Sequence, residues 1–568
     1  MALYDFNNLK RCTQTGAGQH LVQRFKEKYE TEYSGKPIAA LTYAYRNLYY
    51  INGSRWEFEK EYLDRRQRLA ILQVLAVADE SYIQPLEEIL SAICEEFTWV
   101  LPAHHLRPDN TFDYTIIDLF SAETACYLAE TAYIFKERLS PDIRGRILMA
   151  VEKNIFTNYE SRTFDFETAT INWAAVCACG VGLSYLYLCP QRFATIQERL
   201  FSTFKSFLRG FGQDGYCSEG INYWQYGFGM FCVFFDAYVN VTGNRPSFLD
   251  TEQVTKILKY AGNAKMGDGV YLPFADGGLK RFIQNPPFFL TMKHLYEKDM
   301  ELPKLPFFQD DNLPFTATKA LWLRVLCYAD DYLGKESCAE RIAQTALFYP
   351  EAQVYVFKSS SYSFAVKGGC NGDSHNHNDI GAFQIVKGWK RLICDFGAGR
   401  YTKDYFANEA YRYGDECFVC GSQSHSVPIL DGTTQSCGEE YKAILLQQSE
   451  KGVSFDISGA YNTDCKAVAT YVATSSGVQA KYRIEGLRGK VIFRFVSDYL
   501  PLIENGKAMV EGELEIIPDR EICPKIAKVD FETAQKVDSL YTIDYEIAGE
   551  ENVLIQFDFI IKENVNVE

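Results

Sequence analysis

The chain has 568 residues, which is far more than one compact core normally needs, so we expect two or more domains. Its content of 47% hydrophobic and 15% aromatic residues excludes a disordered chain. The formal net charge of −16 argues against nucleic acid or an anionic membrane as the main partner. An acidic ligand held in a local basic cleft stays compatible with this charge.

The start of the sequence and its longest apolar run predict where the protein resides. The N-terminus lacks the apolar segment of a secretory signal, which predicts a cytoplasmic protein. In that compartment the 17 cysteines would be mostly reduced thiols. The nearly apolar stretch 176–189 is shorter than the roughly 18 to 20 residues of a membrane span, so we expect no membrane segment.

Apolar residues recur every three or four positions from about residue 21 to 345, as in 65–78, 85–97, 118–135 and 144–156. This period is typical of amphipathic helices. Short breaks that contain Pro, Gly, Asn or Asp separate the helices. The pattern therefore predicts stacked helical hairpins, without a repeat of fixed length.

The period changes after the Pro-rich, acidic segment 302–315 and one more helical segment near 317–347. Apolar and polar residues then alternate, which predicts strands at 353–358, 362–369, 452–461, 491–500, 508–517 and 552–562. We therefore expect an all-helical domain over 1–347 and an antiparallel β domain over 348–568.

The stretch 371–399 gathers two histidines beside a predicted hairpin. The segment 381–397 reads as two strands around a turn at Lys387 and Gly388, which would return Asp395 toward the histidines. In an extended "SHNHND", His375 and His377 would share a face.

A third histidine, His425, lies in "GSQSHSVPILDG". Together with His377 and Asp395 it would make a ligand set for zinc or a similar divalent ion, although histidines that are only hydrogen-bonded are the alternative. The pair Cys417 and Cys420 could supplement this set, but a single C-x-x-C is a weak motif.

Segments from both halves resemble the heparinase II/III family of polysaccharide lyases. They are "DLFSAETACYLAE", "NWAAVCACGVGL" and "EGINYWQYG" in the helical half, and "HNHNDIGAFQIVKGWKRLICDFGAGRYT" and "SHSVPILDG" in the β half. The resemblance implies an (α/α) toroid, complete or incomplete, followed by an antiparallel β-sandwich domain.

The resemblance also implies cleavage of uronic-acid-containing glycans by β-elimination. Such an enzyme must neutralise the uronate carboxylate, remove the C5 proton and protonate the departing O4. Asn172 matches the neutralising position, Tyr226 the proton shuttle and His375 a second catalytic position. A helix N-cap is the alternative role for Asn172, and Tyr223, on the same helical face, is the rival of Tyr226.

The remaining matches concern binding. Glu219, Tyr223, Tyr401 and Arg412 lie where the family contacts substrate, whereas Asp276 in "PFADGG" reads as a turn. In this family the metal positions correspond to His377, Asp395 and His425, which implies a mainly structural ion, with zinc preferred. Here Ser426, Val427 and Pro428 follow His425 and depart from the family pattern. The assignment of His425 as the third ligand is therefore weaker than that of the other two.

We therefore predict a lyase whose partner is an acidic oligosaccharide. A non-catalytic glycan-binding protein and a metal-dependent glycan hydrolase are the alternatives. The sequence leaves open whether the glycan is of heparan, chondroitin, hyaluronan or alginate type. It also leaves open endo or exo action and a monomeric or homo-oligomeric state.

Overall fold

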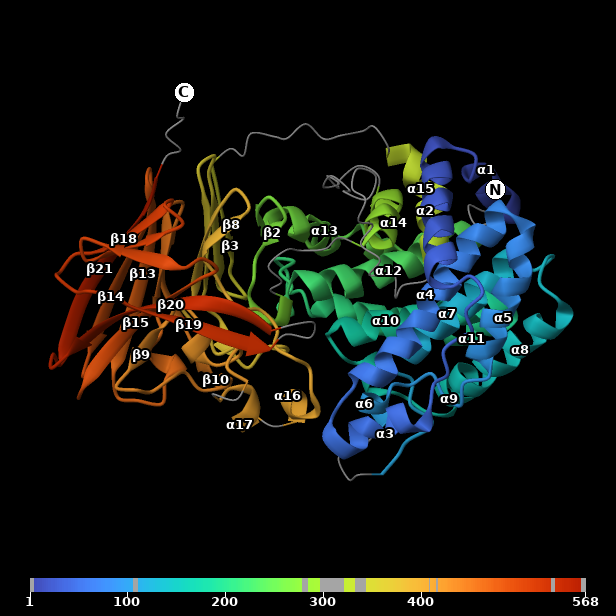
Figure 1. Cartoon of the computed structure of the whole chain (residues 1–568), viewed down its shortest axis with the longest axis horizontal. Coiled ribbons are helices and arrows are strands. Elements are labelled where there is room, and N and C mark those ends of the chain that lie inside the picture. The colour runs from blue at the N-terminus through green and yellow to red at the C-terminus, as the bar shows by residue number, and fades with distance from the viewer. Residues whose placement is uncertain are drawn as a thin grey trace. The chain divides into compact units, whose positions relative to one another are not determined.

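The computed structural model describes residues 5–105, 111–277, 285–296, 321–332, 344–407, 409–414, 417–532 and 537–562 (Figure 1). The chain divides into two compact units. We call residues 1–210, 224–255 and 283–338 the helical unit, and residues 211–223, 256–282 and 339–568 the β unit. The β unit therefore includes two segments from the helical part of the sequence.

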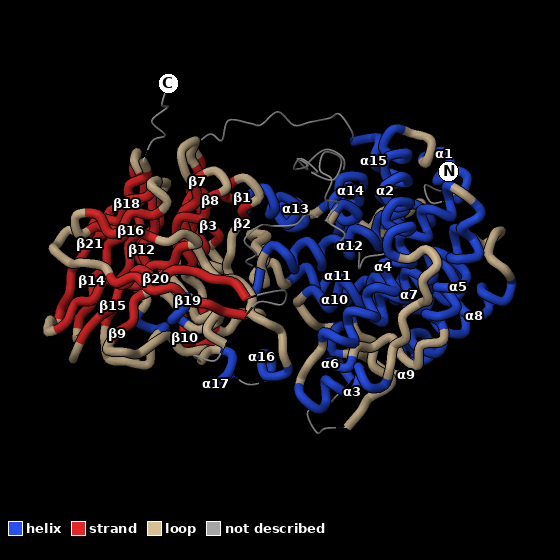
Figure 2. The backbone as a smooth tube through the Cα atoms, viewed as in Figure 1, coloured by secondary structure: helices blue, strands red, loops and turns tan. Residues whose placement is uncertain are grey.

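Helices make up almost all regular structure of the helical unit (Figure 2). The predicted helical period at 65–78 lies within α4, and the period at 118–135 covers α7 with its two cap residues, which confirms the helical reading of this half. The helices are α1 (Phe6–Cys12), α2 (Gly16–Glu32), α3 (Tyr43–Asn52), α4 (Trp56–Ala78), α5 (Ile83–Cys94), α6 (Pro102–His105), α7 (Leu119–Ile134), α8 (Pro141–Val151), α9 (Thr157–Ser161), α10 (Asn172–Leu188), α11 (Pro190–Arg209), α12 (Ile221–Thr242), α14 (Pro286–Tyr296) and α15 (Trp322–Tyr332).

Helices α7 and α10 of this unit pack against each other. Asp118 begins α7 with a capping box, in which its side chain accepts a hydrogen bond from the backbone of Ser121. Opposite, Gly180 of α10 lies so close to α7 that a Cβ at this position would be 2.1 Å from the carbonyl oxygen of Ala122. Glycine is therefore required for this helix contact.

Replacing Gly180 with Ala should lower the free energy of unfolding of the helical unit by about 3 kcal/mol, because the added methyl group overlaps backbone atoms that cannot move aside. The matched control is Gly145→Ala in α8, where no atom lies within 4 Å of the added Cβ. That variant should gain about 0.5 to 1 kcal/mol from helix propensity. Urea unfolding followed by circular dichroism measures both, and equal midpoints would contradict the close packing.

Helix α13 (Glu252–Ala264) leads into the β unit. Its strands are β1 (Lys265–Gly267), β2 (Val270–Tyr271), β3 (Thr345–Tyr349), β4 (Val354–Lys358), β5 (Ser363–Lys367), β6 (Cys370–Asn371), β7 (Phe383–Lys387), β8 (Lys390–Ile393), β9 (Pro428–Leu430), β10 (Gly438–Lys442), β11 (Ile444–Ser449), β12 (Gly452–Asp456), β13 (Lys466–Thr474), β14 (Gly477–Glu485), β15 (Lys490–Ser497), β16 (Pro501–Glu504), β17 (Lys507–Val510), β18 (Leu514–Pro518), β19 (Lys525–Glu532), β20 (Val537–Ala548) and β21 (Asn552–Ile561). Two short helices, α16 (Lys403–Ala407) and α17 (Glu409–Arg412), follow β8.

The strands form antiparallel sheets. The three largest have the orders β3-β4-β5-β7-β8, β19-β20-β15-β9 and β11-β12-β13-β14-β21-β18-β17-β16. Burial alternates along β13 and β21, as expected for strands with one face in a core. The predicted fold class, a helical toroid-type half followed by an antiparallel β-sandwich half, agrees with this organisation.

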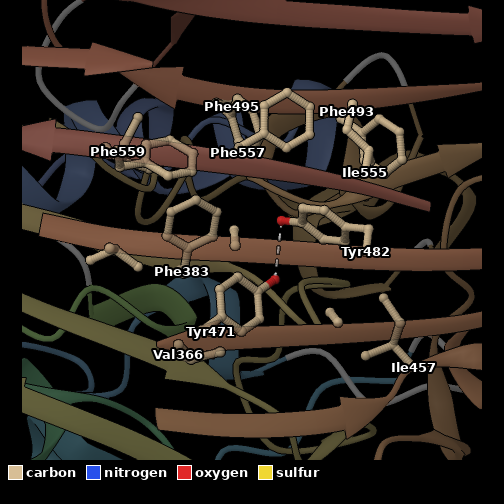
Figure 3. Close-up of a cluster of buried hydrophobic side chains, with 14 of the residues drawn as sticks. Val366, Phe383, Ile457, Tyr471, Tyr482, Phe493, Phe495, Ile555, Phe557 and Phe559 are labelled. Carbon is tan, nitrogen blue, oxygen red and sulfur yellow. Dashed lines mark hydrogen bonds between the residues drawn. The ribbon is translucent and has the colours of Figure 1, made fainter. Parts of the chain in front are cut away.

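An aromatic core joins the three sheets (Figure 3). Phe383 comes from β7, Phe495 from β15 and Phe559 from β21, and their ring centroids lie 5.0 to 5.8 Å apart. In the same cluster the Tyr471 hydroxyl donates to the carbonyl oxygen of Gly381 at 2.6 Å. Gly381 follows the segment that contains the two predicted site histidines. This hydrogen bond therefore ties the end of that segment to the core.

Two predicted elements differ in detail. The helical segment near 317–347 is observed as α15 up to Tyr332, residues 333–343 lie outside the described part, and Thr345–Tyr349 is strand β3. The helical reading of residues 345–347 is therefore wrong, because β3 pairs with β4. The single strand predicted at 508–517 is two strands, β17 and β18, joined by a turn with Gly512 at φ 65°. The segment 302–315 lies outside the described residues.

Among the described helices, none is long and apolar enough to cross a membrane. The cysteines in the described residues are all free thiols.

Candidate functional site

Asp276 is a buried carboxylate on which several site residues of the β unit converge. Its Oδ2 lies 2.7 Å from Nδ1 of His375 and 3.1 Å from the Tyr401 hydroxyl, and its Oδ1 lies 3.0 Å from Nε2 of His377. The Tyr405 hydroxyl also donates to Oδ1. Burial alone would raise the pKa of Asp276, but the hydrogen bonds from His375 and His377 lower it. Asp276 is thus an ionised acceptor at neutral pH.

The segment 256–282 carries Asp276 to the β half of the molecule. The β1–β2 hairpin packs on the β7–β8 turn so closely that a Cβ at Gly267 would lie 1.9 Å from the carbonyl oxygen of Gly388. The backbone N–H of Asp268 donates to the same oxygen at 3.0 Å. These contacts fix the start of the loop that ends in Asp276.

The histidine segment is a turn rather than the predicted extended chain. His375 has a φ of 57°, and the backbone N–H of Asp379 donates to the carbonyl oxygen of His377 at 3.0 Å, so period-two alternation does not apply. The prediction that the two histidines share a strand face is therefore wrong. They meet because both reach Asp276, whose backbone N–H also donates to the carbonyl oxygen of His375 at 3.2 Å.

Two tyrosines extend the hydrogen bonding from Asp276. The hydroxyl oxygens of Tyr401 and Tyr223 are 2.7 Å apart, and the Tyr223 ring stacks on His375 with centroids 4.2 Å apart. Burial first, and the charge of Asp276 second, raise the pKa values of both phenols, so both keep their protons at neutral pH. Tyr223, Tyr401 and His375, which were predicted to share a site, do lie together.

Glu219 and Arg412 also lie at this cluster. Oε1 of the buried Glu219 is 3.8 Å from Nε2 of His375. Arg412 lies 3.6 Å from Oδ2 of Asp276, donates to the carbonyl oxygen of Asn376 at 3.1 Å and covers the ring of Tyr405. These contacts turn Arg412 toward the protein and hold the histidine segment.

The other two predicted catalytic residues, Asn172 and Tyr226, belong to the helical unit. Asn172 is buried at the first position of α10, and Ile171 is the N-cap, so the N-cap alternative is wrong. A Cβ at Gly227, next to Tyr226 on α12, would lie 3.1 Å from the Cα of Asn172, so the two predicted residues occupy neighbouring helices in close contact.

Tyr226 interacts with a buried carboxylate that the sequence reading did not select. Burial raises the pKa of the Tyr226 phenol, and the charge of Glu123 and its hydrogen bond to the phenol raise it further. The same Glu123 also faces the phenol of Tyr127. The neighbouring carboxylate keeps the Tyr226 hydroxyl protonated and oriented.

The three predicted metal ligands lie together in the β unit. His377, Asp395 and His425 are buried, and one donor atom from each lies within 4.8 Å of the others. Asp395 Oδ2 accepts from Nδ1 of His425 at 2.9 Å. Nε2 of His425 and Nδ1 of His377 are buried and have no hydrogen-bond partner among the described residues. Two orphaned imidazole nitrogens beside a carboxylate fit a divalent ion such as zinc.

A second group of possible ligands shares His377 and contains Asp276 and Cys420. It fits an ion less well, because the oxygens of Asp276 already accept from two histidines and two tyrosines. The thiol of Cys420 lies 3.1 Å from the Tyr405 hydroxyl, and burial raises its pKa well above the ordinary range. Of the two groups, His377, Asp395 and His425 therefore fit a metal ion better.

Metal affinity at this group should rise with pH. Burial alone would lower the pKa of His377, but Cys420 and Asp276 raise it to about 9. An ordinary histidine titrates near about 6.5, so protonation stabilises the metal-free fold fully below about 6.5, and this contribution is lost as pH rises through about 9. A metal ion must displace this proton.

The apparent affinity for Zn²⁺ should therefore increase by about tenfold per pH unit for each displaced proton, up to about pH 9. Competition titrations with a chromophoric chelator at several pH values measure this slope. The increase in Tm on adding Zn²⁺ should grow in the same direction. A constant affinity from pH 6.5 to 9 would contradict the protonated state of His377.

Sequence reasoning missed Asp276, Glu123, Tyr405 and the role of Cys420. "PFADGG" carries only turn signals, and Glu123 lies in the middle of an ordinary helical pattern. The one available signal was the position of Glu123 among the apolar residues of α7. Asp and Glu are rarely buried without a partner, so an acid at such a position indicates a polar neighbour.

No protein-family model matches the chain, and no curated protein sequence matches it. Its fold is similar to that of solved structures. Heparinase III has a TM-score of 0.62 at 11% identity, with 98% of this chain and 91% of that chain covered. A mutant of the heparan sulfate lyase HepC from Pedobacter heparinus has a TM-score of 0.56 at 12% identity, with the same coverage.

The chondroitin AC lyase of Streptomyces coelicolor A3, solved in complex with chondroitin sulphate, has a TM-score of 0.52 at 9% identity, covering 96% of this chain and 83% of that chain. At these identities the likeness is one of fold. It extends over nearly the whole chain and confirms the predicted combination of a helical toroid-type half with an antiparallel β-sandwich half.

Proposed function

We propose that the chain is a lyase that cleaves uronic-acid-containing glycans by β-elimination and leaves a 4,5-unsaturated uronate at the new end. One observation carries the proposal. The imidazole of His375 is partly exposed, is held at Nδ1 by the buried Asp276 and is stacked on Tyr223. A carboxylate behind a partly exposed imidazole is an arrangement for moving a proton. The fold shared with heparinase III, the heparan sulfate lyase and the chondroitin lyase supports the same reaction class.

Elimination requires three different groups, and this chain offers a candidate for each. The amide of Asn172 donates to the substrate carboxylate without titrating, which makes the C5 proton more acidic. His375 removes or returns a proton through Nε2, and Tyr226, whose raised pKa keeps its hydroxyl protonated, supplies a proton to the departing O4. For a uronate epimer whose C5 proton is taken by Tyr226 instead, the phenol would first have to lose its own proton.

The proposed substrate-binding residues are Glu219, Tyr223, Tyr401 and Arg412. The two phenols offer ring surface to a sugar while their hydroxyl groups bond within the protein, whereas Arg412 acts mainly by holding the segment 374–379. Zinc, held by His377, Asp395 and His425, would tie this segment to the neighbouring strands β8 and β9. Its role would be structural.

The test is an absorbance assay in the far ultraviolet, where the unsaturated uronate absorbs, with the purified chain and a panel of heparan, chondroitin, hyaluronan and alginate oligosaccharides. A rise identifies both the reaction and the glycan. Cleavage without such absorbance would support the hydrolase alternative, and binding by calorimetry without cleavage would support the glycan-binding alternative. Buried metal ligands disfavour the hydrolase, which needs an open coordination position.

A further inference from the structure

The hydrogen bonds of Asp276 determine where the protons of its neighbours lie. A carboxylate facing donors on both oxygens can only accept. Nδ1 of His375, at 2.7 Å from Oδ2, must therefore carry a proton, and so must Nε2 of His377, at 3.0 Å from Oδ1. The same carboxylate selects opposite nitrogens in two histidines that are two residues apart in the sequence.

Each histidine has a second ring nitrogen that is not bonded to Asp276. In His375 the remaining nitrogen is Nε2, which belongs to the partly exposed ring and lies 3.8 Å from Glu219. In His377 the remaining nitrogen is Nδ1, which is buried without a hydrogen-bond partner among the described residues. One atom is thus available for proton exchange and the other for a metal ion.

Asp276 also determines which hydroxyl is the donor in the hydrogen bond between Tyr223 and Tyr401. Tyr401 has one hydroxyl proton, and it donates that proton to Oδ2 of Asp276 at 3.1 Å. In the 2.7 Å contact between Tyr401 and Tyr223, Tyr223 must therefore be the donor. The bonds run from Tyr223 to Tyr401 to Asp276, so the phenol of Tyr223 gives its proton to Tyr401 and not to the His375 ring on which it stacks.

We propose that Asp276 is the positioning residue of this site. It holds His375 with a proton on Nδ1, which leaves Nε2 as the proton-exchanging atom, and it holds a proton on Nε2 of His377, so that a metal ion displaces the proton on Nδ1 and binds there. The use of His375 Nε2 in catalysis rests on the proposed lyase function. The two proton positions do not, because they follow from geometry alone.

The first test needs no variant of Asp276. The full-length chain, labelled with ¹⁵N-histidine and loaded with Zn²⁺, is examined by long-range ¹H–¹⁵N correlation NMR, in which the two tautomers give different patterns. His375→Gln and His377→Gln serve only to assign the signals. We expect His375 to be protonated at Nδ1 and His377 at Nε2, with Nδ1 of His377 shifted by the metal. An Nε2–H tautomer for His375 or a metal-bound Nε2 of His377 would overturn the proposal.

The second test replaces Asp276 with Asn, which keeps the size but offers one acceptor oxygen and one N–H donor. At most one histidine can then keep its bond to an acceptor, so at least one NMR pattern should change. On a glycan that the wild type cleaves, kcat should fall by about 100-fold or more while KM changes by less than about threefold, because orientation and tautomer are lost rather than binding. The control is Asp268→Asn, an exposed residue in the β1–β2 turn of the same segment.

The two tests separate this inference from the proposed function. If the wild type cleaves no uronate glycan but shows the expected proton positions, the lyase proposal fails and the proton positions of both histidines stand. If the wild type is a lyase and Asp276→Asn keeps both NMR patterns and the wild-type kcat, the positioning role is wrong. Rescue of kcat by Asp276→Glu together with the wild-type NMR patterns would support it further.

Discussion

Replacing Tyr226 with Phe should lower kcat for elimination by about 10²- to 10⁴-fold, the range that a positioned acid or base contributes. The substitution removes one oxygen from a phenol that burial and Glu123 keep protonated at neutral pH. A protonated phenol can give its proton to the departing O4, and a phenylalanine ring cannot. The effect should fall on kcat rather than on KM, because the stacking surface of the ring remains.

Two further variants make this result specific. Tyr127→Phe removes a phenol that faces the same Glu123, and so controls for the changed surroundings of the carboxylate. It should cost about 1 kcal/mol of stability, as one lost hydrogen bond does, and should leave kcat within a few-fold of the wild type. Tyr223→Phe breaks the bond to Tyr401. If Tyr223→Phe abolishes turnover and Tyr226→Phe does not, the shuttle is Tyr223.

The sequence was sufficient for the order of the elements because two periods differ so clearly. Residues 118–135 follow the helical period and become α7, and residues 383–393 alternate and become the hairpin β7–β8. The proximity of the three candidate metal ligands was predictable for another reason. His377 precedes the β7–β8 hairpin and Asp395 follows it. His425 comes shortly before the apolar strand β9, which pairs with β15.

Other features depend on contacts that no local pattern encodes. The segments 211–223 and 256–282 join the β unit through packing such as Tyr216 against Tyr349 and Gly267 against Gly388. Asp276 lies in one of these segments, and its sequence context shows only a turn. A carboxylate that five side chains approach from three separate parts of the chain becomes visible only when those parts are folded together.

The same argument explains the error about "SHNHND". Alternation along a strand predicts that His375 and His377 share a face. In the structure the side chain of Gln435 forms two hydrogen bonds with the backbone of Ile380, which hold the segment as a turn. Long-range bonds to the backbone therefore override the local preference. The histidines meet because one carboxylate binds both, and not because of strand geometry.

Replacing His425 with Ala should remove the metal and lower the free energy of unfolding of the β unit by about 3 to 5 kcal/mol. His425 is fully buried, and its Nδ1 is 2.9 Å from Oδ2 of Asp395. Without the imidazole, Asp395 is a buried carboxylate that has lost its charged partner, which is costly in a protein interior. The lost metal ion adds to this cost, because an ion that binds only the folded state stabilises it.

His294→Ala is the matched control. Its Nδ1 is also bonded to a buried carboxylate, Asp236 at 2.7 Å, but it belongs to neither candidate metal group among the described residues. Both variants should lose stability, and only His425→Ala should lose the metal measured by elemental analysis. A chelator should therefore lower the Tm of the wild type and of His294→Ala, and leave the Tm of His425→Ala unchanged.

If the chelator shifts the Tm of all three proteins equally, the ion is held by other residues. In that case the orphaned nitrogens of His377 and His425 need another partner, because buried imidazole nitrogens without one are costly.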